Sequence, residues 1–247
     1  PRSTLFPYTT LFRSLGRPTN VIGAGRTDAG VHAEGQAANF RAASGLELGE
    51  LGALLNRELP GDIRCLALRE AHTGFHARYR ALDKTYAYRL ALGRPGPGWR
   101  RYSLQAKGNL HLDAMAAACR LFPGERSFKA FTNAKADARG FVRSMLDARV
   151  ERAGAFVDII FKADGFLYNE ARLLAAALLA LGEGRLDESR LGQILDSEDR
   201  RSAPGALGAY GLRLVSIGYR EEDFLGPEVA VPGLPPAGFL GGTARLG

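Results

Sequence analysis

The order of the predicted strands and helices indicates an α+β fold, and two observations lead to this prediction. Apart from one extra short helix, residues 82–225 spell strand, helix, strand, strand, helix, strand, which is the order of a ferredoxin-like (RRM-like) unit with an antiparallel sheet. Residues 15–81 spell strand, strand, helix, strand, which is the same order without its opening strand and helix. With 247 residues, 46% of them hydrophobic, the chain can bury the cores of two such units, and we expect them to lie side by side.

The first unit is predicted to span residues 15–81. Short strands are expected at 20–24 and 33–40, on either side of a glycine-rich loop. Leucines at helical spacing predict a helix over 47–59, which a Pro-Gly pair ends. A strand at 63–68 completes the unit.

The second unit is predicted to span residues 82–225, and its elements are more complete. Alternating Tyr86, Tyr88 and Leu90 indicate its first strand. The leucine stripe of a long helix ends at Gly182, a typical helix stop. The elements expected after the first strand are a helix at 113–122, strands at 144–152 and 156–163, helices at 166–181 and 188–195, and a strand at 212–219.

The two ends of the chain fall outside these units. Residues 1–14 begin with Pro, repeat Thr-Leu-Phe and lack the layout of a signal peptide, so we expect a foreign or read-through segment joined to a truncated gene. This segment would replace the opening strand and helix that the first unit lacks. Residues 226–247 are rich in Pro and Gly and are expected to form a disordered tail.

Composition narrows the class of protein. Lys and Arg number 33 against 26 Asp and Glu, which gives a net charge of +7 and favours a polyanionic partner without separating RNA, DNA or an acidic protein. Cys65 and Cys119 stand far apart, outside any Cys-x-x-Cys, as in a reduced cytoplasmic protein. His72 and His76 lack a third ligand nearby, so we expect no metal site. No apolar run is long enough to cross a bilayer.

The glycine-rich loop at residues 23–36 carries the first candidate site residues, Arg26 and Asp28. A dinucleotide-binding fingerprint needs a third glycine where Asp28 stands, and a P-loop needs Gly-Lys-Ser/Thr, which is absent. What remains is a tight turn that presents one acid beside one cation. A nearby positive charge favours the charged carboxylate, which suits a nucleophile better than a proton donor. The other interpretation is a surface Asp that caps a backbone amide.

The string from Gly25 to Ala33, Gly-Arg-Thr-Asp-Ala-Gly-Val-His-Ala, resembles the active-site motif of the TruA family of tRNA pseudouridine synthases. The resemblance implies that Asp28 is catalytic and that Arg26 contacts phosphate or fills the space that a flipped base leaves. It also implies two α/β domains with a central cleft, a cytoplasmic homodimer, and tRNA as partner. The family's opening Tyr-Asp-Gly strand and Val-Gln helix are absent here.

A second block, Phe75-His-Ala-Arg78 followed by Tyr86-Ala-Tyr88, is similar to the family's Phe-His-Ala-Arg block and Tyr-x-Tyr strand. The resemblance implies that Tyr86 stacks on the target base. An aromatic face can hold a flipped base, and a phenol can assist proton movement at C5 of uracil. The alternative is an ordinary core tyrosine on a strand.

A third block, Phe166-Leu-Tyr-Asn-Glu-Ala-Arg172, resembles the family's Phe-Leu-x-x-Met-Val-Arg-x-x-Val-Gly. The resemblance implies that Arg172 pairs with the catalytic Asp28; the alternative is a solvated helix residue. Glu170 replaces the family's Met, and Ala176 replaces its Gly. A Glu170 that faced inward would disfavour a charged Asp28 through like-charge repulsion.

The implied reaction converts uridine to pseudouridine in the anticodon stem-loop of tRNA, at positions 38–40. The bond between ribose C1′ and uracil N1 breaks, and a carboxylate lowers the barrier electrostatically, by covalent attack or by proton abstraction. No metal or cofactor is expected. Two alternatives stay open: an inactive RNA-binding remnant of the family, and a hydrolase with Asp28 and Glu34 as paired carboxylates.

Overall fold

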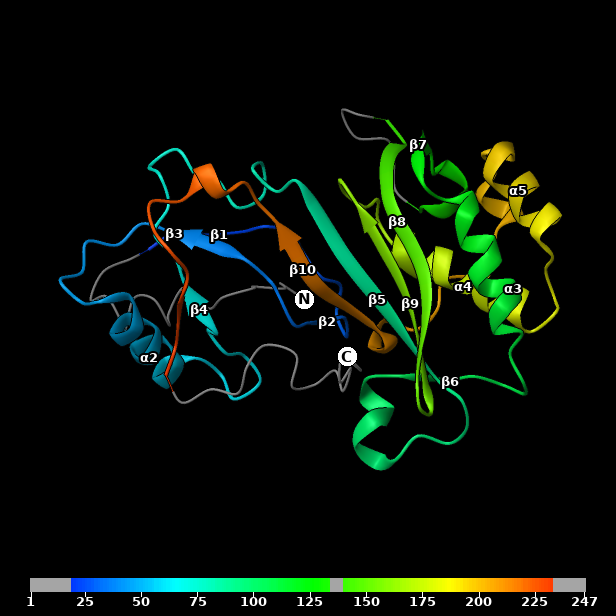
Figure 1. Cartoon of the computed structure of the whole chain (residues 1–247), viewed down its shortest axis with the longest axis horizontal. Helices are drawn as coiled ribbons and strands as arrows, with labels where there is room; N and C mark the ends of the chain where they lie inside the picture. The colour runs from blue at the N-terminus through cyan, green and yellow to red at the C-terminus, as the bar shows by residue number, and fades with distance from the viewer. Residues whose placement is uncertain (1–18, 134–139, 233–247) are drawn as a thin grey trace. The chain divides into compact units, whose positions relative to one another are not determined.

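The computed structural model describes residues 19–133 and 140–232 (Figure 1). The predicted foreign segment, residues 1–14, lies outside the described residues, as does most of the predicted tail. The described residues form two compact units, the first from residues 19–26, 34–82 and 217–232, and the second from residues 27–33, 83–133 and 140–216. One boundary between the units falls between Leu82 and Asp83, and Thr27–Ala33 groups with the second unit.

The described part of the first unit holds one α-helix and two small sheets. Helix α2 (Leu48–Glu58) begins after Glu47, whose backbone N–H donates to the Glu50 carboxylate, and the helix packs its leucine face inward as predicted. Its two sheets each have two antiparallel strands: β1 (Val21–Gly23) with β3 (Ala38–Phe40), and β4 (Ala67–Leu68) with β11 (Val229–Ala230). Strand β11 lies in the part of the sequence that was predicted as tail.

The strand predicted at 33–40 is two separate strands. Strand β2 (His32–Ala33) pairs in parallel with β10 (Leu212–Gly218), while β3 pairs with β1. Residues 34–37 run between them, and the Gln36 side chain donates a hydrogen bond to the Gly25 carbonyl. The alternation of polar and apolar residues along the sequence cannot show that a strand is interrupted. The interruption arises because β2 and β3 pair with different strands that are distant in sequence.

The second unit combines one seven-stranded sheet with α-helices, which is consistent with the predicted α+β class. Its strand order is β2-β10-β5-β9-β8-β7, with β6 paired to β5. The sheet is not purely antiparallel, because the two-residue strands β2 and β6 pair in parallel. The strands not yet bounded are β5 (Asp83–Ala91), β6 (Leu104–Gln105), β7 (Gly124–Ser127), β8 (Val142–Ala153) and β9 (Phe156–Ala163).

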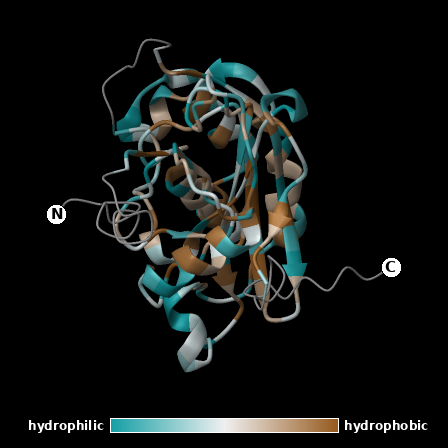
Figure 2. Cartoon of the chain, turned by 90° about the vertical axis from the view of Figure 1, so that its left-hand side faces the viewer, coloured by the Kyte–Doolittle hydropathy of each residue, from teal (hydrophilic) through white to brown (hydrophobic). Residues whose placement is uncertain are grey.

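Helices cover one side of this sheet (Figure 1). They are α3 (Leu112–Ala118), α4 (Glu170–Gly182) and α5 (Glu188–Ser197). Helix α4 is hydrophobic all round and lies in the core, and Arg172 is its only residue that is not buried. Gly182 lets α3 approach, since a Cβ there would lie 2.4 Å from the Met115 sulfur. Figure 2 shows the hydrophobic residues gathered along the strands and helices of the interior.

Helix α4 begins four residues later than predicted. Asn169 adopts a left-handed backbone conformation with φ of 63°, which ends the preceding turn. Asn tolerates this conformation better than most residues do. The apolar pattern runs through both the turn and the helix, because both are buried, so the sequence pattern did not show where the helix starts.

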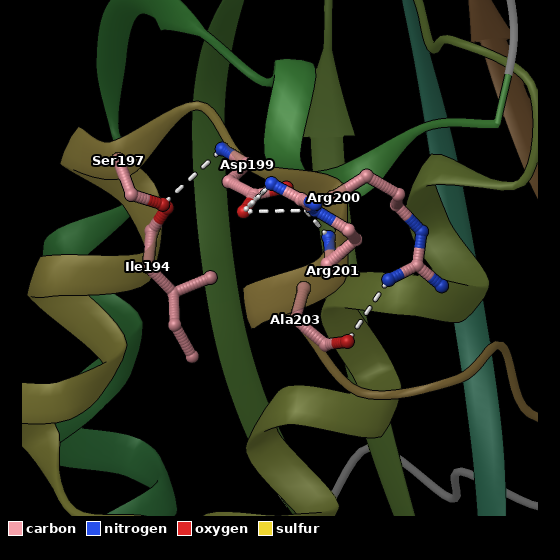
Figure 3. A network of polar contacts seen from close by, with 6 residues as sticks. All are labelled: Ile194, Ser197, Asp199, Arg200, Arg201 and Ala203. Carbon is pink, nitrogen blue, oxygen red and sulfur yellow. Dashed lines mark hydrogen bonds and ion pairs between the residues drawn. The ribbon is translucent and has the colours of Figure 1, made fainter.

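A network of polar contacts fixes the chain after α5 (Figure 3). Ser197 donates to the Ile194 carbonyl and accepts from the Asp199 backbone N–H. The Asp199 carboxylate accepts from the backbone and side chain of Arg201, and Arg200 donates to the Ala203 carbonyl. The network thereby fixes the start of residues 203–211, which return to the N-terminal end of α4.

Within residues 19–133 and 140–232, no helix is long and apolar enough to cross a membrane. The same described residues contain no group of three or more His, Cys, Asp or Glu side chains that could hold a metal ion.

Candidate active site

Asp28 lies in a tight turn directly before β2. The Val31 backbone N–H donates to the Asp28 carbonyl over 3.0 Å, and Gly30 adopts φ of 86°, a conformation that glycine takes without strain. The Asp28 side chain keeps 37% of its surface exposed. The turn therefore presents a carboxylate that an external nucleoside can reach.

Arg172 faces this carboxylate from the first turn of α4. Its Nη1 lies 3.6 Å from Asp28 Oδ2, an ion pair that is too long for a hydrogen bond. Two other contacts hold the guanidinium: Nε donates to the Leu207 carbonyl over 2.7 Å, and Nη1 donates to Asn169 Oδ1 over 2.8 Å. The Arg172 side chain is only 18% exposed. The guanidinium is thus fixed by the protein, while the carboxylate stays open.

Tyr86 lies on β5 in the same unit. Its ring meets the edge of Phe166 with 5.1 Å between ring centres. Burial, and then the negative charge of Asp28, raise the pKa of Tyr86 to about 12. The phenol therefore keeps its proton at neutral pH. Within the described part of the chain its hydroxyl makes no hydrogen bond, so it can donate to a substrate.

A second tyrosine, Tyr88, supports residues 207–211, the segment whose Leu207 carbonyl accepts a hydrogen bond from Arg172. The Tyr88 hydroxyl donates to the Gly208 carbonyl over 2.8 Å, directly after the Leu207 carbonyl that Arg172 binds. A Cβ on Gly211 would lie 2.7 Å from the Tyr88 ring, so only glycine allows this close approach. Tyr88 is thus a core residue that positions residues 207–211.

Glu170 is fully buried at the start of α4. Its Oε2 accepts a hydrogen bond from the Leu167 backbone N–H over 2.6 Å, while Oε1 has no hydrogen-bond partner among the described residues. Burial raises the pKa of Glu170 to about 8, against the Leu167 hydrogen bond and the positive charge of Arg143. Glu170 does face inward, but it is mostly uncharged at pH 7. The like-charge repulsion that we expected from an inward Glu170 is therefore largely absent.

We expect Glu170→Gln to stabilise the protein increasingly as pH rises from 5 to 8. The folded state holds a proton on Glu170 at pH values where the unfolded chain has lost it, so the free energy of unfolding falls between about pH 4.5 and 8. Glutamine keeps an oxygen for the Leu167 N–H and cannot lose a proton. Urea unfolding at pH 5, 6, 7 and 8 measures the effect, which we expect to exceed about 1 kcal/mol at pH 8. The exposed Glu125→Gln is the control, and equal pH profiles for both variants would contradict the prediction.

The structure unites three of the four predicted site residues, because Asp28, Arg172 and Tyr86 lie in the second unit. Arg26 is exposed in the loop that follows β1, in the first unit, and takes part in no ion pair among the described residues. Glu34, the other carboxylate of the hydrolase alternative, also belongs to the first unit.

Sequence reasoning missed the residues that support Arg172. They are Asn169, through its amide oxygen, and Leu207, through its backbone carbonyl. An Asn directly before a helix is a recognisable signal for a cap or a left-handed residue. A backbone carbonyl carries no signal in the sequence, because any residue supplies one.

Comparisons with known proteins identify the family of this chain. A sequence profile described as tRNA pseudouridine synthase matches residues 118–220. The tRNA pseudouridine synthase A of Bacillus sp. (strain KSM-64) is 39% identical over 212 residues, which cover 85% of this chain and 86% of that protein. The protein of the same name from Caldicellulosiruptor bescii is 38% identical over 205 residues, which cover 83% and 84%. The tRNA pseudouridine synthase A 2 of Bacillus cereus (strain ATCC 10987 / NRS 248) is 36% identical over 204 residues, or 82% and 83%. As the motif around Asp28 predicted, the chain belongs to the tRNA pseudouridine synthase family.

Proposed function

We propose that this chain converts uridine to pseudouridine in the anticodon stem-loop of tRNA, at positions 38–40, with Asp28 as the catalytic residue and no cofactor. Family membership supports an isomerase that acts on tRNA. The observation that carries the role of Asp28 is its ion pair with Arg172, 3.6 Å long, in which the arginine is held by the protein and the acid remains accessible.

The reaction requires a negative charge beside the ribose. When the bond from C1′ to N1 breaks, positive charge develops on the sugar and uracil leaves as an anion. The Asp28 carboxylate can stabilise that charge, attack C1′, or remove a proton from the sugar. Arg172 orients the carboxylate and offsets its charge before substrate arrives, which lowers the cost of reorganisation during the reaction.

Tyr86 is proposed to contact the flipped base. A base that leaves its stack needs an apolar surface, which Tyr86 and Phe166 supply together. Because the phenol stays protonated at neutral pH, its hydroxyl can donate to a carbonyl of uracil or assist proton movement at C5.

Tyr86→Phe is expected to leave tRNA binding unchanged within about 2-fold and to slow isomerisation by about 10-fold to 100-fold, at the low end of general acid–base contributions. The ring and its contact with Phe166 remain, whereas the hydroxyl is lost. Single-turnover rates on labelled tRNA measure the effect. The control is Tyr79→Phe, which removes the hydroxyl of an exposed tyrosine in the first unit. An unchanged rate for Tyr86→Phe would leave the residue with a stacking role only.

The remaining proposals rest on the resemblance and on strand order. The order β10-β5-β9-β8, with α3 and α4 as connections, supports a ferredoxin-like second unit. The first unit is proposed to be the same fold without its opening strand and helix. We further propose that Arg26 contacts phosphate or fills the space of the flipped base, and that the protein is a cytoplasmic homodimer.

The test is pseudouridine formation by the wild-type chain on unmodified tRNA, followed by release of tritium from C5-labelled uridine and by mapping of the modified positions. We expect release to require the anticodon stem-loop and to map to positions 38–40. Binding of tRNA without release would identify an inactive remnant. Release of free uracil would identify a hydrolase, since an isomerase keeps base and ribose joined.

A further inference from the structure

A loop in a basic segment of the second unit has no part in the chemistry described above. Residues 84–112 contain six Lys or Arg and no Asp or Glu. Their centre is a loop at residues 93–102, here called the Trp99 loop, which contains the short 3-10 helix Pro97–Arg101. The loop carries Arg94, Arg100 and Arg101, and all three side chains are exposed.

These three arginines differ from the other exposed arginines of the unit. Within residues 19–133 and 140–232 their guanidinium groups make no hydrogen bond or ion pair. Exposed arginines elsewhere in the unit mostly have acidic partners, as in the pairs Arg120–Glu188, Arg149–Asp147, Arg185–Glu183 and Arg201–Asp199. The Trp99 loop is therefore a concentration of uncompensated positive charge, and such a surface attracts polyanions.

The Trp99 loop is anchored to the sheet. The Trp99 ring packs on Phe156 of β9 with 5.0 Å between ring centres, and the Arg89 guanidinium lies 5.4 Å from each ring. Arg89 is itself fixed by two hydrogen bonds to Asp158, of 2.8 and 2.6 Å. Burial alone would raise the pKa of Asp158, but its hydrogen bonds with Arg89 and Arg213 hold the pKa below the usual value. The anchor thus stays charged at neutral pH.

The Trp99 loop is also tied to the chain segment that carries Asp28. The His32 Nε2 donates to the Arg101 carbonyl over 2.8 Å, and the His32 ring lies 4.5 Å from the ring of Tyr102. His32 is four positions after Asp28 in the sequence, so their Cα atoms are at most about 14 Å apart. An RNA strand whose nucleoside reaches Asp28 has its neighbouring phosphates within range of this loop.

We infer that the Trp99 loop binds the phosphate backbone of tRNA beside the target uridine, through Arg94, Arg100 and Arg101. This inference rests on the proposed function. Guanidinium groups match phosphate with paired donors, and contacts to phosphate fix the register of a nucleic acid without reading its sequence. Because Trp99 and His32 already hold the loop, little conformational entropy is lost when the phosphates bind.

The test compares two triple variants of equal charge. One is Arg94→Ala/Arg100→Ala/Arg101→Ala. The control is Arg120→Ala/Arg185→Ala/Arg190→Ala, whose arginines lie directly after α3, between α4 and α5, and on α5. Binding of full-length tRNA is measured by filter retention from 50 to 300 mM KCl, and kcat and KM are measured at 150 mM.

We expect the first triple variant to weaken binding about 10-fold or more at 150 mM KCl and to reduce the slope of log K against log salt by about 2 to 3, one unit or slightly less per lost phosphate contact. Its kcat should stay within about 2-fold of wild type while KM rises, and the control should bind as wild type does. Equal slopes for both variants, or a wild type that binds no tRNA, would overturn the inference. A wild type that binds tRNA but forms no pseudouridine would refute the proposed function. The salt slopes of the two triple variants would still show whether the Trp99 loop binds phosphates of tRNA.

Discussion

Asp28→Ala is expected to abolish pseudouridine formation while tRNA binding is retained. The carboxylate is the group that meets the developing positive charge, and its loss is expected to lower the rate by at least about 1,000-fold, as for a preorganised electrostatic group. The side chain is partly exposed and accepts no hydrogen bond from a backbone amide of the described residues, so the protein should remain folded. Tritium release from C5-labelled tRNA under single-turnover conditions measures the loss.

Two further variants sharpen this prediction. Asp28→Asn keeps the shape and removes only the charge, so it should be as inactive as Asp28→Ala if charge is what matters. Glu34→Gln removes the other carboxylate that a hydrolase would need, and it should retain wild-type turnover. Turnover by Asp28→Ala would exclude Asp28 as the catalytic residue, and equal losses in the Asp28 and Glu34 variants would favour the two-carboxylate alternative.

Arg172→Met is expected to reduce the rate of isomerisation by about 100-fold to 1,000-fold, the range for loss of one preorganised electrostatic group. Methionine fills part of the volume but leaves Asp28 without a counter-charge, and it leaves the Leu207 carbonyl and the Asn169 amide without their donor. Each lost partner in this half-buried place costs about 1 to 3 kcal/mol of stability. Single-turnover rates and urea unfolding separate the two effects.

The coupling between Arg172 and Asp28 can be isolated with a double-mutant cycle. If Arg172 acts through Asp28, then Arg172→Met should reduce the residual rate of Asp28→Asn by much less than it reduces the rate of wild type. Arg172→Lys keeps a positive charge without the forked donors and should fall between wild type and Arg172→Met. Arg190→Met, on the exposed side of α5, is the matched control. Fully additive losses in the cycle would contradict a role for Arg172 through Asp28.

Local patterns in the sequence predicted much of the fold. The helix at 47–59 is α2, and the paired strands at 144–152 and 156–163 are β8 and β9, because leucines at helical spacing and alternating residues report directly on which face is buried. The predicted start of α4 was wrong by four residues. Its turn and its helix are equally buried, and only the conformation of Asn169 divides them.

The candidate site was predicted in part. The motif around Asp28 and the block ending at Arg172 were visible as residue strings, but nothing in either string specifies a distance between them. The structure supplies the 3.6 Å ion pair and shows that Glu170, which looked like a competing charge, is buried and mostly protonated. Whether a carboxyl is charged depends on neighbours that the sequence does not place.

The sequence by itself determined the family of this protein, its secondary structure in outline and the chemical groups available to it, because these depend on residue identity and local spacing. Only the tertiary structure decided that Thr27–Ala33 joins the second unit and that Asn169 and the Leu207 carbonyl hold Arg172. It also decided that the arginines of the Trp99 loop lack acidic partners among residues 19–133 and 140–232. These facts depend on contacts between segments far apart along the chain, and such contacts arise when the core of the unit is packed.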